Sequence, residues 1–351
     1  MMIVFPSTSS NSSFTKCVRK HNMDYSFPSN QQLPTLSNAE TCTGTQKCFD
    51  GKIFKQTADL VHNIEKGPLV LNAQNYPSIT SFVFTSCKWD RCSAQNGGAI
   101  YVTTSNYQLE VKRSQFLSCQ ATGQFGGGIY AQPASLVHVD SSCFYNCQCK
   151  GTGGDDGGGG ICVHSISTEV ILISTDFLSC AVQADAGGVT FRNSHSTLGN
   201  EKTFQNCRFI SCSGQSDGGA VLAWGNDYNA GFTNIIFHSC SSLVSGAVEA
   251  TLLQPVNNVV SFCFFNKNTG TYGDDFSFAD PLPENNNYLL QSFTTTTSRK
   301  VGDYSGRAWK SLSVNCLLHS YNYVLECENK PNHKTKITTV LPSHTEALSL
   351  R

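Results

Sequence analysis

A short motif recurs along the middle of this chain, and it constrains the fold more than any other feature of the sequence. An aromatic residue is followed three positions later by cysteine, and successive aromatic residues are 27 to 33 positions apart. A fixed period of this length is typical of stacked structural units that cannot bury their apolar faces alone. The motif occurs at Trp89 and Cys92, Phe116 and Cys119, Phe144 and Cys147, Phe177 and Cys180, Phe209 and Cys212, Phe237 and Cys240, with a degenerate copy at Phe264 and Lys267.

A second motif follows each complete copy of the first after a polar loop. It reads Gly-Gly, then a small residue, then an aliphatic residue; single positions vary, but the second position is always glycine. Glycine at a fixed corner allows a positive φ or a close approach between two backbones. The second-position glycines are Gly98, Gly127, Gly159, Gly187, Gly219 and Gly246.

Apolar residues around the two motifs alternate with a period of two. They stand seven and five positions before most of the aromatics, as Leu109 and Val111 do, and on both sides of a variable position after Gly-Gly, as Ile129 and Ala131 do. Such alternation indicates strands, in which the variable position faces outward. Each period thus holds three short strands, and three strands in about 29 residues, repeated, are typical of a parallel β-helix.

We therefore predict an all-β fold, a single-stranded parallel β-helix (a solenoid) of about seven to eight coils with three short strands per coil. The helix spans residues 47–280 and begins with a weaker coil that contains Phe49, Phe54 and Gly67–Leu71. Residues 1–46 are rich in Ser, Asn, Thr and Gln and form an irregular N-terminal segment or cap. Residues 281–351 form a C-terminal cap and a poorly ordered tail.

Equivalent side chains of successive coils should form columns, because parallel strands stack about 4.8 Å apart. The aromatic residues would then fill the interior, and the repeated cysteines would pack inside a bend, where a small and weakly polar side chain fits. We expect a packed thiol column rather than a set of cross-links, although neighbouring cysteines are close enough for an oxidised subset. Cys143, Cys147 and Cys149 are the best candidates for a local disulfide or a reactive thiol.

Composition excludes several classes of function. The net charge is −1 and only 14% of the residues are charged, so the chain has no basic surface for nucleic acid or anionic membrane. No run of residues approaches the roughly 18 apolar positions of a spanning helix. The apolar run of Met1–Pro6 is too short for a signal peptide. The repeat cysteines lack the paired Cys-x-x-Cys spacing of a zinc site, so we expect neither a metal nor a cofactor.

The two motifs resemble the Phe-x-x-Asn and Gly-Gly-Ala-Ile repeats of the polymorphic outer-membrane-protein family of chlamydiae, which has similar repeat proteins in trichomonad protists. The likeness covers roughly residues 82–276, with cysteine in place of asparagine. It implies a right-handed parallel β-helix and a surface-exposed or secreted, adhesin-like protein. The bacterial members' β-barrel translocator and the surface members' membrane anchor are not recognisable in this sequence.

Acidic residues at one corner are the candidate binding residues. Asp185 and Asp217 each directly precede the Gly-Gly motif in adjacent coils, and Asp155 and Asp156 lie near the same corner one coil earlier. Like charges so close together raise a pKa or recruit a cation. A solvated corner, a Ca²⁺-type site and a catalytic pair like that of the pectate lyases and polygalacturonases are the three interpretations.

A further set of apolar residues directly follows the aromatic positions: Leu117, Tyr145, Leu178 and Ile210. They lie either on a partner-binding outer surface or buried at the bend. The leading functional prediction is a non-enzymatic, adhesin-like repeat protein that presents sheet faces and corner loops to a protein or a glycan. The alternatives are a polysaccharide lyase or glycosidase of pectate-lyase-like fold that uses the corner carboxylates, and a truncated family member without an independent function. The oligomeric state stays open.

Overall fold

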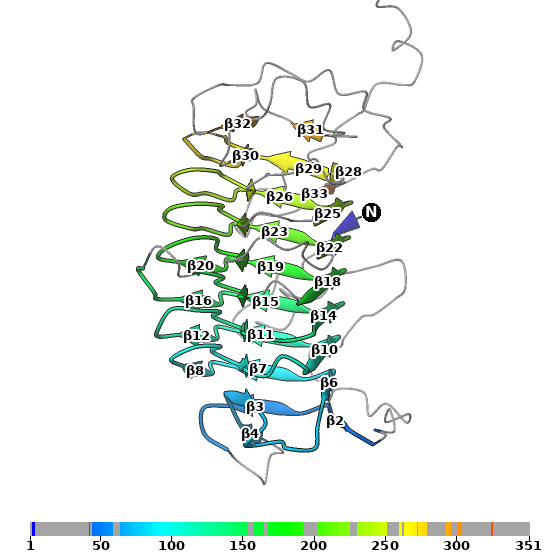
Figure 1. The fold of residues 1–351 in the computed structure, drawn as a ribbon. Helices are drawn as coiled ribbons and strands as arrows, with labels where there is room; N and C mark the ends of the chain where they lie inside the picture. The colour runs from blue at the N-terminus through cyan, green and yellow to red at the C-terminus, as the bar shows by residue number, and fades with distance from the viewer. Residues whose placement is uncertain are drawn as a thin grey trace, which may run out of the picture.

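The chain forms a parallel β-solenoid in the computed structural model (Figure 1). The structure describes residues 2–3, 42, 44–58, 64–153, 157–164, 168–192, 202–224, 230–250, 260–261, 263–271, 273–278, 293–295, 301–303 and 324–325. Within these ranges all regular secondary structure is strand, and no helix is long and apolar enough to cross a membrane. The predicted all-β, parallel fold is therefore confirmed.

Two long sheets run the length of the stack on either side of one corner. Sheet 1 has eight strands: β2 (Gln46–Asp50), β6 (Ser81–Thr85), β10 (Gln108–Lys112), β14 (Leu136–Asp140), β18 (Glu169–Ile173), β22 (Lys202–Gln205), β25 (Ala230–Thr233) and β28 (Val260–Ser261). Sheet 2 has ten: β4 (Ile64–Lys66), β3 (Ile53–Lys55), β7 (Lys88–Asp90), β11 (Gln115–Leu117), β15 (Cys143–Tyr145), β19 (Asp176–Leu178), β23 (Arg208–Ile210), β26 (Ile236–His238), β29 (Cys263–Asn266) and β31 (Phe293–Thr295).

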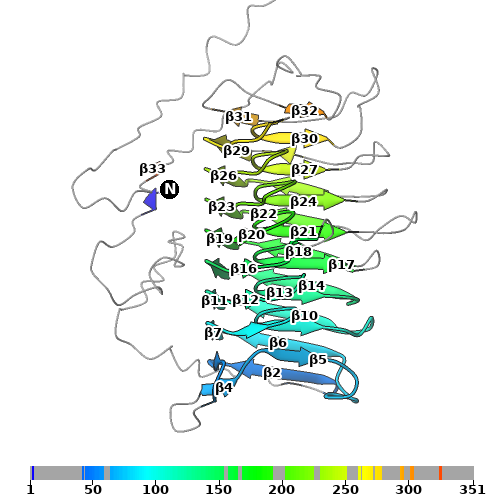
Figure 2. The ribbon, with the colours of Figure 1, turned by 90° about the vertical axis from the view of Figure 1, so that its left-hand side faces the viewer.

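The remaining strands complete the coils (Figure 2). Sheet 3 has nine strands: β5 (Leu69–Leu71), β9 (Ile100–Val102), β13 (Ile129–Ala131), β17 (Ile161–His164), β21 (Val189–Arg192), β24 (Val221–Trp224), β27 (Val248–Ala250), β30 (Phe276–Phe278) and β32 (Val301–Asp303). A short sheet 4 lies in the loop between sheets 2 and 3: β8 (Ser93–Ala94), β12 (Gln120–Ala121), β16 (Gln148–Cys149) and β20 (Ala181–Val182). Separately, β1 (Met2–Ile3) pairs with β33 (Val324–Leu325).

The strand register follows the repeat of the sequence. Leu109 pairs with Val137, and Val111 with Val139, so the same inward positions meet in successive coils. The weaker first coil is present as predicted, because Phe49 pairs with Phe84. At the other end, β31 and β32 extend sheets 2 and 3 within the segment that the sequence assigned to a C-terminal cap.

The aromatic column is the centre of the core. Neighbouring rings are 4.3–5.2 Å apart between centroids and within 15° of parallel. The degenerate copy at Phe264 is wrong by one position: Phe265 stacks on Phe237, and Asn268 takes the cysteine position. Counting one repeat length from Phe237 leads to Phe264 or to Phe265. Both are phenylalanine, and only the strand pairing shows which of them enters the column. The stacked rings are those of Phe54, Trp89, Phe116, Phe144, Phe177, Phe209, Phe237 and Phe265.

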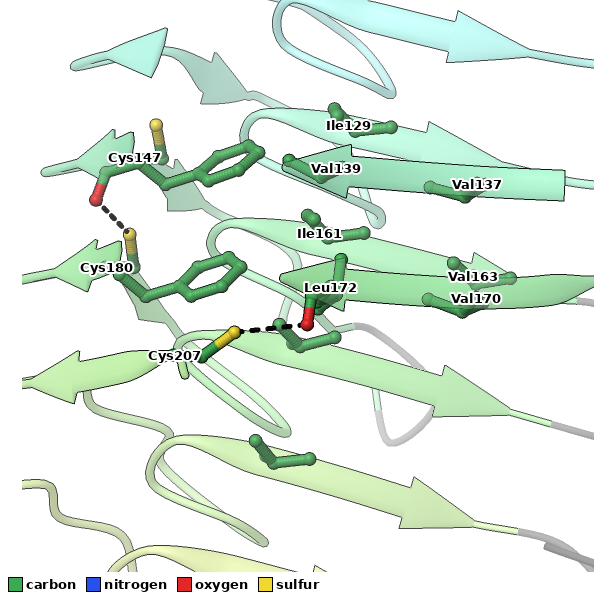
Figure 3. Packing of buried hydrophobic residues seen from close by; sticks show 14 of the residues in the cluster. Ile129, Val137, Val139, Cys147, Ile161, Val163, Val170, Leu172, Cys180 and Cys207 are labelled. Atoms are coloured by element: carbon green, nitrogen blue, oxygen red, sulfur yellow. Dashed lines mark hydrogen bonds between the residues drawn. The ribbon is translucent and has the colours of Figure 1, made fainter. Parts of the chain in front are cut away.

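The six repeat cysteines form a second column of buried, free thiols. Each thiol lies within hydrogen-bonding distance of the carbonyl oxygen of the aromatic residue one coil earlier, as Cys212 does with Phe177 at 3.4 Å and Cys180 with Phe144 at 3.4 Å. Figure 3 shows Cys147 and Cys180 above one another in this column. Burial raises the pKa of the Cys212 thiol well above its usual value, which keeps the donor proton in place. In the last copy Asn268 Nδ2 makes the same contact with the Phe237 carbonyl oxygen, at 3.3 Å.

A second corner, before the aromatic strand, uses the same chemistry with more varied residues. The position two before each aromatic donates to a backbone carbonyl where it is a thiol or a hydroxyl, as Cys207 does to Leu172 and Thr175 to Val139. A non-glycine residue with positive φ precedes both kinds of corner, for example Ser174 and Ser179 at 51° and 53°. This left-handed conformation turns the chain at each side of the short aromatic strand. The corner residues before the aromatics are Cys87, Ser114, Ser142, Thr175, Cys207, Ile235 and Cys263.

The invariant second glycine of the Gly-Gly motif reflects close backbone approach. A Cβ atom at Gly98 would clash with the carbonyl oxygen of Gly127, and a Cβ atom at Gly219 with that of Gly246. Positive φ is found instead at the first glycine of the early copies, such as Gly97 at 58°. The two glycines of the motif therefore meet two different requirements.

Candidate functional site

The predicted acidic corner contains a buried ion pair. Arg192, the last residue of β21, donates from Nε and from one terminal nitrogen to Oδ2 of Asp185, at 2.9 and 2.7 Å. Asp185 is 0% exposed, and no hydrogen-bond partner contacts its other oxygen among the described residues. Asp217, from the next coil, is half-buried. A solvated corner is therefore wrong for Asp185, because Arg192 and the surrounding chain replace its water.

The two carboxyl groups influence each other across the coils. Burial raises the pKa of Asp185 to about 8; Arg192 opposes this shift, and the nearby Asp217 adds to it. Burial also raises the pKa of Asp217, and the neighbouring Asp185 and the charge of Arg192 oppose this shift. The predicted coupling of these two residues is therefore present. The pair can hold one proton near neutral pH, as carboxylates that share a site do.

This geometry limits the chemistry of the corner. The guanidinium of Arg192 already occupies Oδ2 of Asp185, so a cation would have to displace it. Among the described residues no group of three or more His, Cys, Asp or Glu side chains is placed to hold a metal ion. Asp155 and Asp156 lie outside the described residues. A fully buried, ion-paired carboxylate also cannot reach a polymeric substrate, which disfavours Asp185 as a catalytic group.

An aromatic group on the outer face of sheet 3 was not predicted. Tyr130 stacks on Tyr101 from the coil before, at 5.0 Å between centroids, and on Phe125 from the loop of its own coil, at 4.8 Å. His164 meets Phe125 edge-on at 4.4 Å and Tyr130 at 5.7 Å. The hydroxyl of Tyr130 donates to Oε1 of the exposed Gln132. We call Tyr101, Phe125, Tyr130 and His164 the aromatic patch.

The strand geometry explains why the patch lies outside the core. In β13 Ile129 and Ala131 face inward, so Tyr130 between them faces outward, as the alternation predicts. Tyr130 itself is buried, whereas Tyr101, Phe125 and His164 are each partly exposed. The signal in the sequence was the pair of tyrosines at the variable position of two adjacent coils, but the loop residue Phe125 has no repeat equivalent that would have drawn attention to it.

Other outward positions are less exposed than the sequence suggested. The variable position after Gly-Gly was expected to face outward, and the pairing places it there, yet Cys162, Thr190, Leu222 and Glu249 are all buried. The apolar residues that follow the aromatics also face outward, where Leu117 and Leu178 are buried and Tyr145 and Ile210 partly so.

The three crowded cysteines have three different states. Cys143 is disulfide-bonded, but Cys147 and Cys149 are both free, so the predicted local disulfide within this group is wrong. Cys147 belongs to the buried thiol column, and Cys149 is a buried free thiol within 3.0 Å of the carbonyl oxygen of Gln124. Burial at all three positions disfavours a reactive thiol.

Comparison with known proteins adds no identification. The chain matches no protein-family model, and searches of curated proteins and of solved structures found no match either.

Proposed function

We propose that this chain is a non-enzymatic, adhesin-like binding protein that engages a glycan through the outer face of sheet 3. The aromatic patch is the observation that carries this proposal. Its partly exposed rings are held by neighbouring rings on a rigid sheet, so a ligand that stacks on them would not have to order them first. The exposed amide of Gln132 stands beside the rings, as a polar group that can fix the orientation of a sugar.

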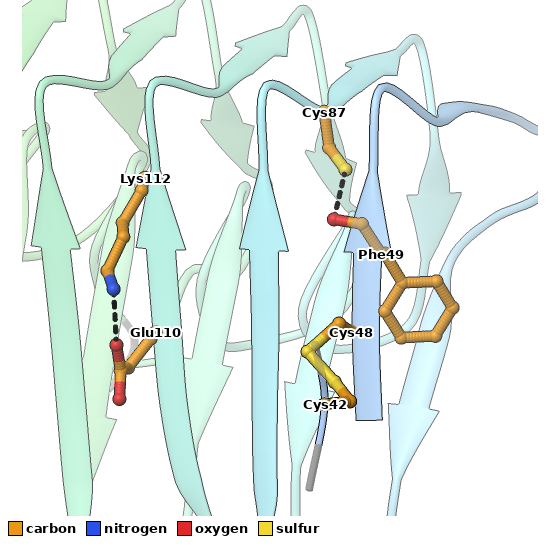
Figure 4. Close-up of a disulfide and its surroundings, with 6 residues drawn as sticks. All are labelled: Cys42, Cys48, Phe49, Cys87, Glu110 and Lys112. Atoms are coloured by element: carbon orange, nitrogen blue, oxygen red, sulfur yellow. Dashed lines mark hydrogen bonds and ion pairs between the residues drawn. A yellow bond between two sulfur atoms is a disulfide. The ribbon is translucent and has the colours of Figure 1, made fainter. Parts of the chain in front are cut away.

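A second observation supports a location outside the reducing cytosol. Cys48 in β2 forms a disulfide with Cys42 (Figure 4), and Cys143 is disulfide-bonded as well. Disulfides form and persist mainly in oxidising compartments. The buried thiol column is compatible with such a compartment, since its members are inaccessible to oxidants. This supports the cell-surface or secreted location that the family resemblance implies; the resemblance itself stays a proposal. Protease treatment of intact and lysed cells, detected with an antibody against the repeats, tests the location.

Glycan binding is tested with the full chain on a glycan array and then by calorimetry on any hit. We expect Tyr101→Ala and Phe125→Ala to abolish binding, because each removes an exposed stacking surface. Leu243→Ala is the matched control, since Leu243 is 63% exposed and lies outside the aromatic patch. Retention of full affinity by both patch variants would contradict this assignment.

The enzymatic alternative depends on one observation, the raised pKa of Asp217 and Asp185. Of the two, only Asp217 is partly accessible, so a lyase or glycosidase would have to use it as the proton donor or acceptor. Assays on polyuronides with and without Ca²⁺, for the wild type and Asp217→Asn, decide the matter. Turnover that is lost in the variant would favour an enzyme over an adhesin.

A further inference from the structure

The stack of rings in the aromatic patch is open at the end that faces β5. Tyr101 and Tyr130 are paired positions of β9 and β13, and their rings are within 17° of parallel at 5.0 Å, close to the spacing of the strands. The ring faces therefore look along the axis of the solenoid. Phe125 also stacks on Tyr130, and two rings cannot share one face, so Tyr130 is covered on both sides. The second face of Tyr101 is turned toward the preceding coil.

A valine occupies the next position of this outward column. Val70 pairs with Tyr101, and β5 is the last strand of sheet 3 (Figure 2). A valine side chain ends at its γ carbons, where a tyrosine ring begins, so Val70 covers only the part of the Tyr101 ring nearest the backbone. Val70 is 38% exposed and is, with Leu243, one of two large apolar side chains that the described residues expose. We call the step between the two side chains the Tyr101–Val70 notch.

The groups around the notch are polar but uncharged. The neighbours of Val70 bond through their backbones to β9 and the residues that flank it, so the carbonyl group of Val70 faces the free edge of sheet 3. Asn75, which is exposed, donates from Nδ2 to this carbonyl oxygen at 2.9 Å, and its amide therefore lies beside Val70. Residues 69–76 and 99–104, which contain the two strands and the turns after them, have no charged side chain.

We propose that the Tyr101–Val70 notch binds one neutral pyranose ring, which stacks on the open face of Tyr101 and packs its edge against Val70. This inference rests on the proposed function and assigns the position and the class of the sugar. A stacked ring lies about 3.5–4 Å from an aromatic face, so the sugar would lie at the level of Val70 and continue the column of outward rings. The C–H groups on one face of a pyranose supply the apolar surface for stacking, and the amide of Asn75 is within reach of its hydroxyls. Sialic and uronic acids are disfavoured, because their carboxylate would lose water without gaining a cationic partner.

Val70→Tyr tests the notch, because it adds a ring without removing one. The new ring would stack on the open face of Tyr101 and fill the space of the sugar. Binding to the full chain is measured by ligand-observed NMR titration, with the methyl glycosides of galactose, glucose and mannose as neutral probes and methyl glucuronide as the charged probe. We expect a neutral probe to bind the wild type, and Val70→Tyr to raise its dissociation constant about tenfold or more. Leu243→Tyr is the matched control, since it adds the same ring at the other exposed apolar position and should leave binding unchanged.

The outcomes distinguish this inference from the proposed function. Loss of binding in Tyr101→Ala with full binding in Val70→Tyr would place the sugar elsewhere on the aromatic patch, which overturns the notch and supports the glycan-binding proposal. A wild type that binds no neutral probe, or that prefers the glucuronide, would also overturn the notch. Full binding in both Tyr101→Ala and Val70→Tyr would overturn both proposals.

Discussion

In strand β19, Phe177 points inward and stacks on its equivalents in the coils on both sides, whereas Asp176 points outward and meets Arg208 from the next coil. The inward stacking occurs again in coil after coil with an aromatic residue at the same position. Among the described coils, no other has an Asp–Arg pair at the outward positions of Asp176 and Arg208. The difference shows that the repeat determines the interior of this solenoid, while its outer faces depend on individual pairs of residues that the period does not specify.

Removing an inward ring should have the largest effect. Phe177→Ala should lower the free energy of unfolding by ~3–5 kcal/mol, because it leaves a cavity between two stacked rings. The outward Tyr101→Ala is the control and should cost under ~1 kcal/mol, since its ring is partly exposed. Urea denaturation measures both. Equal losses of free energy in the two variants would mean that the inward and outward rings contribute equally to stability, against the difference that we describe.

Breaking the outward ion pair of Asp176 and Arg208 should lower the free energy of unfolding almost as much as removing an inward ring. Arg208→Met leaves the buried carboxylate of Asp176 uncompensated, which should lower the free energy of unfolding by about 3 kcal/mol. The double variant Asp176→Leu with Arg208→Leu should recover most of this loss, because no buried charge then remains at these two positions. A small loss in Arg208→Met would indicate that water reaches the carboxylate of Asp176.

The acidic corner should make stability depend on pH. The pKa of the folded Asp185 is raised from 3.8 to about 8, so between these values the folded protein keeps a proton that the unfolded chain has released. The stability that this proton contributes is therefore fully present below about pH 4 and is lost as the pH rises through about 8. The free energy of unfolding falls by at most ~1.4 kcal/mol per pH unit in this range. Asp185→Asn, a neutral mimic, should flatten this dependence in urea denaturation. A slope unchanged in the variant would show that the corner does not titrate.

The two corners beside the aromatic strand should be the most tolerant parts of the interior, and the corner before it more tolerant than the thiol column. Cys180→Ala removes one weak hydrogen bond and a small volume, and we expect it to cost about 1 kcal/mol. Cys207→Ser, at the other corner, should be nearly neutral, because serine already occupies that position in two coils. Thermal unfolding compares the two variants. A larger loss for Cys207→Ser would contradict the greater tolerance of that corner.

The sequence predicted what the repeat controls and missed what it does not. The parallel register, the aromatic column and the role of Gly98 and Gly219 follow from positions that recur. Equivalent residues of successive coils lie against each other in a stack, so a residue type that repeats packs against its own kind. The aromatic patch and the Asp176–Arg208 pair join residues that occur once. Their partners come from neighbouring coils, and the loop lengths hide which positions meet.

The position of the last ring shows the same limit at the end of the array. Counting could not decide between Phe264 and Phe265, whereas the pairing of β26 with β29 does. The ion pair of Asp185 was missed because Arg192 lies seven residues later, at the end of β21, with no repeated equivalent to mark it.

The most direct test of the account is the state of the column cysteines in the native protein. Cys92, Cys119, Cys147, Cys180, Cys212 and Cys240 are buried free thiols in the structure. Native alkylation followed by mass spectrometry should therefore leave all six unmodified, and alkylation in denaturant without a reductant should modify all six. Disulfides between them, or rapid labelling of several in the native protein, would contradict a solenoid whose interior is a stacked thiol and aromatic column.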